Sequence, residues 1–336
     1  MHFGVLQFFS WPGRRVPLET VYERALQRVD IMDQNGYDAV WLAEHHFTTY
    51  SVCPSVHLMG MHIAGRTKNI RIGTAVSLAP LYHPMRLAEE VALLDVLSGG
   101  RVNWGAGRGF DANEFKTFGV PAEESSERFR EAVEIVLAAW QNEKISWQGK
   151  YWNFEEVEVL PKPLQKPHPP HWVAASSLPA IDWAGQNGHS IMMDPHSTHE
   201  AIAEKRARYQ GELEAHGHSI KGRQIPIGRL IACAPTDKEA EDIARAGAGW
   251  TVDAYVNEKS LGAKPDRANS TGFASLQGGD PVQNYLDSTV LHGSPEKLVD
   301  QLQALESEIP LDYLLCSPLS HSSFKLFTEK VLPRFL

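Results

Sequence analysis

The chain has 336 residues, and 32 Lys and Arg against 41 Asp and Glu give it a formal net charge of −9 with His neutral. An acidic chain without a long basic run is not expected to bind nucleic acid, because a phosphate polymer is held by clustered Lys and Arg. Hydrophobic residues make up 43% of the chain and charged residues 22%, as in a globular protein with a large core. The length allows one large α/β barrel or two ordinary domains.

Cysteine usage and hydropathy bear on where the chain resides. Cys53, Cys233 and Cys316 stand in no Cys-x-x-Cys arrangement, so neither a disulfide framework nor a zinc site is expected and a reducing compartment is favoured. No apolar run approaches the roughly 20 residues that a membrane span needs. The segment from Met1 to Leu6 lacks the basic region and apolar stretch of a secretory signal. We therefore expect a cytoplasmic protein that does not bind a membrane.

Apolar segments and helical repeats alternate from the first residues onward. Residues 3–8 and 39–43 are short and apolar, and the second lacks polar alternation, as in a strand covered on both faces. Between them, apolar residues recur at steps of three and four up to Gly36, which predicts an amphipathic helix. The pair of elements then repeats, with helices predicted over 54–64 and 84–97 and strands over 70–76 and 101–104.

The second half of the chain continues this alternation with longer connections. A helix is predicted over 123–141, and residues 145–160 are predicted to form a hairpin that turns at Gln148-Gly149-Lys150. Residues 250–290 contain Gly and Ser with weak periodicity, so we expect an insertion or a mobile lid there. Further strands are predicted over 171–174, 190–193, 225–233 and 311–316, and further helices over 179–186, 199–216, 237–247 and 294–305.

The order of elements favours one architecture. Eight strands, each followed by a helical segment, predict an α/β fold in which residues 1–336 form a single (β/α)8 TIM barrel. The alternative, a doubly wound sheet that binds a dinucleotide, needs a Gly-x-Gly-x-x-Gly turn after the first strand, and residues 7–13 do not supply one. The chain exceeds the roughly 250 residues typical of the barrel. We assign the surplus to the hairpin region 145–160 and the lid insertion 250–290, both at the carboxyl-terminal mouth.

Polar residues follow the second predicted strand, at the end where the active site of such a barrel gathers. Glu44, His45 and His46 leave a wholly apolar segment. For His45 we favour a catalytic role, because an imidazole can donate or accept a proton near neutral pH. For His46 a structural hydrogen bond within the mouth is the better interpretation.

The ends of the fourth and fifth predicted strands carry residue types that hold a phosphate. Arg108 lies among three glycines in the segment 105–109, so a ligand could approach the backbone closely beside a forked cation. Ser176 and Ser177 precede a helix, where hydroxyls and free backbone N–H groups form an anion site, although plain N-capping explains Ser177 equally well. Together these residues predict a phosphate bound between the two strands, and a phosphorylated cofactor is its simplest source.

Six segments, in the same order from the first strands to the last, resemble the bacterial luciferase-like flavin monooxygenases. They are residues 40–47, 72–76, 83–86, 94–101, 105–109 and 293–296. The resemblance implies a (β/α)8 barrel that binds reduced FMN (FMNH2), delivered by a separate NAD(P)H:flavin reductase. The reduced flavin then reacts with O2 to give a C4a-(hydro)peroxyflavin, which transfers oxygen to a small organic substrate. The resemblance also implies a homodimer formed through the helices that follow strands two and three.

The resemblance assigns roles to individual residues. By position, His45 matches the family's catalytic histidine, which stabilises or protonates the peroxide. Ala75 matches a small residue at a bulge of strand three, often in a non-proline cis peptide, that supports the flavin ring. Arg108 matches a residue that grips the FMN phosphate, as do Ser176 and Ser177 on the other side.

Two departures from the luciferases argue against light emission. Gly107 stands where the luciferases proper carry a reactive cysteine, and Ser176 where they carry a glutamate. We therefore expect a non-luminescent monooxygenase. We also expect Gly107 to leave room over the flavin for a bulkier or cyclic substrate. Glu114, just beyond this turn, either orders the loop over the flavin or is exposed to solvent.

Three alternatives remain open at this point. A metal-dependent barrel hydrolase could draw ligands from 15 histidines and the Glu44-His45-His46 cluster, but the first strand has no His-x-His pair and the eighth ends without a carboxylate. We therefore assign no metal ligand. An F420-dependent oxidoreductase of the same superfamily would bind its cofactor in the same place. A non-catalytic flavin-binding subunit is the third alternative, and His45 argues against it.

Overall fold

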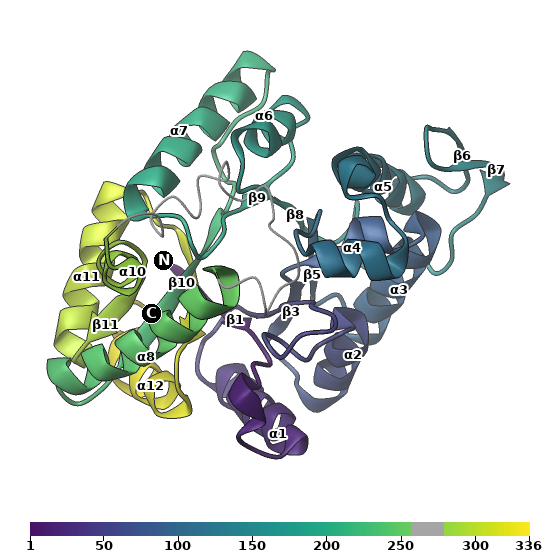
Figure 1. The fold of residues 1–336 in the computed structure, drawn as a ribbon. Helices are drawn as coiled ribbons and strands as arrows, with labels where there is room; N and C mark the ends of the chain where they lie inside the picture. Colours follow the sequence, from purple (N-terminus) through teal and green to yellow (C-terminus); the bar gives the residue numbers. More distant parts are fainter. Residues whose placement is uncertain (257–278) are drawn as a thin grey trace.

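The computed structural model describes residues 1–256 and 279–336, in which strands and helices alternate (Figure 1). In chain order they are β1 (His2–Gln7), α1 (Leu18–Gln34), β2 (Ala39–Leu42), α2 (Val56–Arg66), β3 (Arg71–Thr74), β4 (Ser77–Leu78), α3 (Pro84–Leu97), β5 (Val102–Gly107), α4 (Ala112–Phe118), α5 (Ser125–Gln141), β6 (Ile145–Gln148), β7 (Asn153–Val157), β8 (His171–Ala174), α6 (Leu178–Gln186), β9 (Ile191–Met192), α7 (His199–Ala215), β10 (Pro226–Cys233), α8 (Asp237–Val256), α10 (Pro281–Thr289), β11 (Leu291–Gly293), α11 (Pro295–Glu308), β12 (Tyr313–Pro318) and α12 (His321–Leu326). Short 3-10 helices span Pro12–Arg14, Ala79–Leu81, Ala122–Glu124 and Leu332–Arg334, and a π-helical turn spans Phe327–Val331.

Ten of the strands form one curled, parallel sheet, which confirms the predicted α/β class. Its order is β11-β10-β12-β1-β2-β3-β5-β8-β9, with β4 beside β5. The predicted closed barrel is not formed as a continuous ladder, because the sheet is open between β9 and β10. Only an isolated parallel bridge, Met193 to Ile227, joins them there, since β9 is just two residues long.

The concave face of the sheet holds its own buried cluster. Trp41 on β2 and Trp172 on β8 are three places apart in the sheet, yet their rings lie 5.2 Å apart. The sheet must therefore curl so that these two side chains meet across its inner face. Neighbouring strand residues such as Val40 and Val173 instead join the core beneath the helices. Burial on both faces explains why these strands read as apolar without alternation.

Helix α3 shows how local sequence sets the helical layer. Pro84 occupies its first turn, and the His83 ring accepts a hydrogen bond from Met85 N at 3.3 Å. Proline suits this position because its missing N–H would have no partner inside the helix. The helix is followed by Gly99 at φ +73°, a conformation that glycine adopts without strain. The predicted bounds 84–97 are therefore confirmed.

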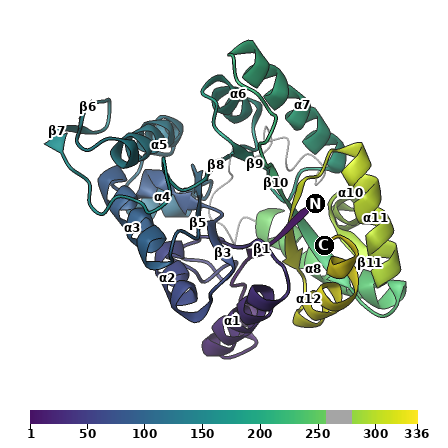
Figure 2. The same ribbon diagram turned by 180° about the vertical axis from the view of Figure 1, so that it is seen from behind.

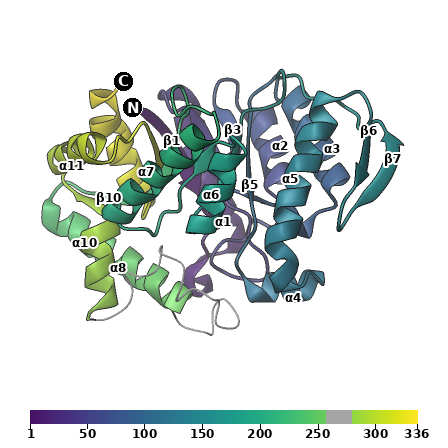
Figure 3. The same ribbon diagram turned by 90° about the horizontal axis from the view of Figure 1, so that it is seen from above.

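Helices α4, α8 and α10 lie at one end of the sheet, and both chain termini lie at the other (Figure 3). Since α4 follows β5 and α8 follows β10, this end is the carboxyl-terminal mouth. Figure 2 shows the molecule from the opposite side, where β1 begins. In the described part of the chain, no helix is both long and apolar enough to cross a membrane.

The two predicted insertions differ from expectation. β6 and β7 form the expected antiparallel hairpin, but it projects from the outer side of α5 instead of lying at the mouth (Figure 1). The hairpin belongs to the connection from α5 to β8, which leads to the amino end of β8. Trp147 Nε1 donates to Glu131 of α5 at 3.2 Å, so the hairpin is tied to that helix. In the other insertion, residues 250–256 and 281–289 are helical, not weakly structured. The rest of the expected lid, residues 257–278, lies outside the described residues.

Candidate active site

The side chain of His45 lies in an aromatic enclosure at the mouth. His45 follows β2 and is 8% exposed. The ring of Phe8 stacks near it at 6.2 Å between centroids, while Tyr50 and Phe110 present their edges at 5.0 and 5.8 Å. Such a setting excludes bulk water from the imidazole and strengthens its interaction with any nearby charge.

That nearby charge is Glu114 on α4. Its carboxylate is buried, at 2% exposure, and Oε1 accepts a hydrogen bond from His46 N at 2.8 Å. The same oxygen lies 3.7 Å from His45 Nδ1, a buried nitrogen that has no hydrogen-bond partner among the described residues. Of the two possibilities that the sequence left open for Glu114, its burial excludes exposure to solvent. The Glu114 carboxylate thus faces the Nδ1 edge of the imidazole.

Asp111 adds a second buried carboxyl group close to His45. It caps α4 by accepting a hydrogen bond from Asn113 N at 2.8 Å. Burial raises the pKa of Asp111 above its usual value, while the hydrogen bond from Asn113 and the nearby His45 oppose that rise. The α4 segment therefore places two acidic side chains beside one imidazole.

Glu44 and His46 form a structural network behind the enclosure. Glu44 Oε1 accepts hydrogen bonds from Tyr82 OH at 2.9 Å and from His46 Nε2 at 3.0 Å. Burial, together with the Glu44 carboxylate, raises the pKa of Tyr82 far above its usual value, so the phenol stays protonated. His46 thus makes the structural hydrogen bond predicted for it. Within residues 1–256 and 279–336, no three His, Cys, Asp or Glu side chains are grouped so as to hold a metal ion.

The predicted phosphate residues leave adjacent strands. β5 pairs in parallel with β8, with Ala106 opposite Val173, so Arg108 and the two serines emerge from neighbouring strand ends. The exposed Arg108 donates from Nη1 to Ser125 Oγ at 3.3 Å. Ser177 is the N-cap residue of α6, but its hydroxyl makes no capping hydrogen bond. Simple helix capping therefore does not account for this serine.

Ala75 lies between these two groups of residues. The Ala75–Val76 peptide is cis, as the resemblance implied. Ala75 N donates to Leu42 O at 2.7 Å, which ties the end of β3 to β2. Ala75, Val76 and Ala174 are partly buried and pack on the inner cluster of Trp41 and Trp172. They give the mouth a small, apolar floor.

The structure gives another reason for two of the glycines near Arg108 than the close approach of a ligand that the sequence indicated. A Cβ atom at Gly105 would lie 2.0 Å from Thr74 O, and one at Gly107 would lie 2.3 Å from Val76 Cγ2. Close packing of β5 against the β3 end therefore requires both glycines. The expectation that Gly107 leaves room for a bulky substrate is wrong, because Val76 fills that space.

The five predicted residues thus lie at the ends of four consecutive strands. His45 follows β2, Ala75 follows β3, Arg108 follows β5, and Ser176 and Ser177 follow β8. The sequence did not single out the aromatic wall around His45. Phe8 directly follows β1 and Phe110 directly follows the glycine segment, so an aromatic residue just beyond a strand end was the available signal.

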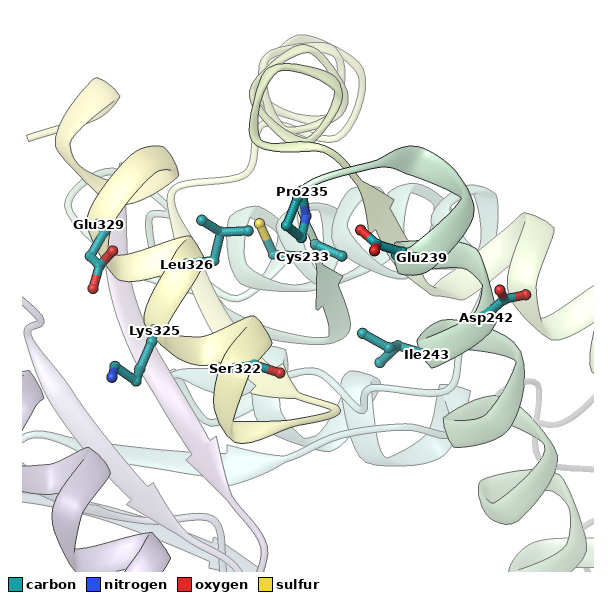
Figure 4. A pocket seen from close by; sticks show the side chains of 10 residues that line it. Cys233, Pro235, Glu239, Asp242, Ile243, Ser322, Lys325, Leu326 and Glu329 are labelled. Atoms are coloured by element: carbon teal, nitrogen blue, oxygen red, sulfur yellow. The ribbon is translucent and has the colours of Figure 1, made fainter.

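A separate hollow of about 620 Å³ lies between α8 and α12 (Figure 4). Acidic Glu239, Asp242 and Glu329 surround it together with Lys325, above the buried Cys233. None of the predicted site residues lines it. Because it lies outside the set of strand ends that carries His45 and Arg108, we do not regard it as the active site.

Comparison with known proteins agrees with this geometry. A family model described as luciferase-like monooxygenase matches residues 1–310. The chain is 26% identical over 317 residues to the oxygenase component of a flavin-dependent trigonelline monooxygenase from Acinetobacter baylyi. That match covers 91% of this chain and 86% of the relative.

Two solved structures share the fold over nearly the whole chain. Monooxygenase RslO1 from Streptomyces bottropensis superimposes with a TM-score of 0.84 and 25% identity, covering 100% of both chains. The oxygenating constituent of 3,6-diketocamphane monooxygenase from Pseudomonas putida, a type II Baeyer-Villiger enzyme in complex with FMN, gives a TM-score of 0.82 and 22% identity. It covers 100% of this chain and 99% of its own.

Proposed function

Because this chain belongs to the luciferase-like monooxygenases, we propose that it is the oxygenase component of a two-component system. It is an enzyme of the flavin-dependent monooxygenase class. In the proposal it receives reduced FMN from a separate NAD(P)H:flavin reductase and uses O2 to oxygenate a small organic substrate. The observation that carries the proposal is the arrangement of His45, Ala75, Arg108 and the two serines on four consecutive strand ends.

The donor set of this chain fits FMN. Arg108 offers a guanidinium at the end of β5, and Ser176 and Ser177 offer hydroxyls at the adjacent end of β8. A forked cation beside hydroxyls and a helix N-terminus is the chemistry that a phosphate monoester needs. Between them and His45, the apolar floor at Ala75 and Val76 suits a flat ring. When bound, the reduced flavin supplies the electrons that activate O2.

His45 would hold and move the proton that the reaction needs. Glu114 faces Nδ1, so a proton at Nδ1 is stabilised by its carboxylate and Nε2 is left to exchange protons with the reacting molecule. The aromatic enclosure keeps bulk water from competing for that proton. Glu114 acts through His45 and is a positioning residue, not a catalytic one.

The residues that depart from the luciferases support a non-luminescent enzyme. Gly107 cannot be replaced by a larger residue while Val76 occupies its present place, so the position held by the luciferase cysteine is sealed here. Phe8, Tyr50 and Phe110 instead present apolar surface around His45. A small, largely apolar organic molecule is the substrate class that such walls favour.

The assembly and surroundings of the chain form part of the proposal. Helices α2 and α3 expose Leu58, Leu93, Val96 and Leu97, and an exposed apolar surface of this kind marks a protein interface. We therefore propose a homodimer through these helices. The isolated bridge from Met193 to Ile227 supports the proposal that β9 and β10 lie side by side as in a (β/α)8 barrel. Three buried, unpaired cysteines support a cytoplasmic location.

One experiment tests the reaction and separates the main alternative. The protein is mixed with photoreduced FMN, isotope-labelled O2 and a panel of small apolar ketones, aldehydes and aromatic compounds. We expect label from O2 in a product, with oxidation of reduced FMN to FMN matched to product formation. Turnover with reduced or oxidised F420 under argon, where no O2 is present, would instead identify an F420-dependent oxidoreductase.

A further inference from the structure

A second cavity lies at the end of the sheet opposite His45. It has a volume of about 380 Å³ and opens among the amino ends of the strands. Arg71 begins β3 and His171 begins β8, while Ser190 directly precedes β9 and Gln224 lies two residues before β10. The volume lies within the range of about 300–1,000 Å³ that small-molecule sites occupy.

Two guanidinium groups give this cavity a positive wall. Arg71 donates to Asn103 Oδ1 at 2.7 Å and Gln165 Oε1 at 2.9 Å, and Arg223 donates to Gly188 O at 2.9 Å. These partners are all neutral. Within the described residues, neither arginine has a carboxylate at ion-pair distance.

Among the described residues that line the cavity, Asp38 has the one carboxylate, and that group already accepts a hydrogen bond. Asp38 accepts a hydrogen bond from the hydroxyl of Tyr313, which in turn accepts one from Trp41 Nε1 at 3.0 Å. Two arginines against one carboxylate leave the wall net positive. This local excess stands out in a chain whose formal net charge is −9, and it attracts anions.

His171 supplies a hydrogen-bond acceptor beside these donors. His189 Nε2 lies 3.0 Å from Glu134 Oε1, so it carries the proton of that contact. His171 Nε2 lies 3.1 Å from His189 Nδ1. In the tautomer in which His171 Nε2 donates this hydrogen bond, Nδ1 of a neutral His171 has a lone pair. Burial, with His189, His168 and Arg223 nearby, lowers the pKa of His171 to about 3, so the ring is neutral at ordinary pH.

We propose that this cavity binds a small oxyanion, the carboxylate or phosphate group of a small metabolite or inorganic phosphate itself. Arg71, Arg223 and Ser190 line the cavity, and Arg223 Nη1 donates to Ser190 Oγ at 3.3 Å. In the proposal, the two guanidinium groups and the Ser190 hydroxyl bind the anionic oxygens. His171 accepts a hydrogen bond from a protonated oxygen or hydroxyl of the same ligand. The site is independent of the FMN site, because Trp41, Trp172 and Tyr313 fill the sheet interior between the two ends.

The test must separate this site from the phosphate residues at the mouth. We would use an Arg108→Gln background, which removes the mouth cation, and titrate inorganic phosphate or malonate at constant ionic strength by calorimetry. The background protein is expected to bind phosphate, malonate or both at one site per chain. Binding of phosphate alone identifies a phosphate group as the ligand chemistry, and binding of malonate alone identifies a carboxylate. If neither phosphate nor malonate binds, the proposal is overturned.

A matched pair of variants locates the binding within the molecule. Gln224→Glu adds a carboxylate to the cavity wall without changing side-chain size, and should weaken binding by about tenfold or more. Gln148→Glu makes the same change on the exposed β6 strand and should leave affinity unchanged. Arg223→Gln, which removes a wall cation, provides a second measurement should Gln224→Glu fail to fold. Equal affinity in the parent and in a folded cavity variant would overturn the proposal. FMN binding is measured separately with Gln224→Glu alone, which keeps Arg108. Retained FMN binding then shows that a loss of phosphate binding does not arise from damage to the proposed oxygenase site.

Discussion

Oε1 of Glu114 lies 3.7 Å from Nδ1 of His45, and it is the nearest charge that the enclosure offers to that ring. The two residues come from different strand ends, and the backbone N of His46 fixes the carboxylate between them. Replacing Glu114 by Gln keeps an acceptor for His46 but removes the charge. We expect turnover to fall by about tenfold and its pH profile to shift, with FMN affinity unchanged. Glu123→Gln, on the exposed 3-10 turn before α5, is the control; an unaltered pH profile in the Glu114 variant would reject the positioning role.

Removing His45 tests its assignment as the proton-handling residue. His45→Ala should lower kcat by about 100-fold to 10,000-fold, the range that general acid–base groups contribute. FMN binding should persist, because Arg108 and the serines lie on other strands. His62→Ala, at an exposed position on α2, serves as control. Undiminished turnover in His45→Ala would reject His45 as the proton-handling residue.

The phosphate contact is separable from the rest of flavin binding. Arg108→Gln should weaken FMN binding by about 10-fold to 100-fold, because hydrogen bonds to charged groups contribute about 1.5–3 kcal/mol. Riboflavin lacks the phosphate, so its affinity should not change. Lys116→Gln removes an exposed positive charge on nearby α4 and should affect neither ligand. An equal loss for FMN and riboflavin would show that Arg108 does not contact the phosphate.

The exposed apolar residues of α2 and α3 predict a dimer that charge can split. Leu58 is 75% exposed and Leu97 is 60% exposed. Placing Glu at both positions buries uncompensated charge in a dimer but not in a monomer, so the mass measured by light scattering should halve. Leu160→Glu, at a site 57% exposed beyond the β6–β7 hairpin, should leave the mass unchanged. A wild-type protein that is monomeric at micromolar concentration would refute the interface.

The buried histidine at the base of the sheet predicts a loss of stability in acid. The pKa of His171 is lowered from 6.5 to about 3, so between these values the unfolded chain binds a proton that the folded chain does not. Stability therefore falls as the pH drops below 6.5, by about 1.4 kcal/mol per pH unit from this residue. His171→Gln should reduce the slope of unfolding free energy against pH by that amount, as measured by urea titration from pH 7 to pH 4. An unchanged slope would show that His171 titrates normally.

The sequence was most informative where a residue's neighbours along the chain decide its structure. The strands from β1 to β10 lie within about two residues of their predicted positions, apart from a split of the third into β3 and β4 and an extension of β5 to Gly107. β12 spans Tyr313–Pro318 instead of 311–316, because pairing of Tyr313 with His2 on β1 sets its register. That contact joins opposite ends of the chain, and no local pattern encodes it.

The elements that the sequence missed are short or depend on distant partners. α4 has seven residues, too few for a repeating helical pattern of apolar residues to show in the sequence, and it begins where Asp111 caps it. β4 has two residues and is a strand only because Ser77 pairs with Ala106 on β5. The glycines were misinterpreted for a similar reason. A glycine at position 107 looks the same in sequence whether a ligand or the Val76 side chain fills the space beside it.

The ring of Trp250 stacks on Tyr50 at 5.3 Å between centroids and 9° between planes, and Tyr50 in turn presents its edge to His45. One wall of the reaction chamber is thus supported by Trp250 of α8. This residue lies about two hundred positions after His45 in the chain. During synthesis, β2, β3, β5 and β8 are made before α8. All the proposed cofactor contacts are therefore present in the nascent chain before Trp250 can complete the wall of the chamber. Oxygen chemistry on a reduced flavin is wasteful when water can enter, and this order of synthesis delays completion of the chamber until most of the chain has been made.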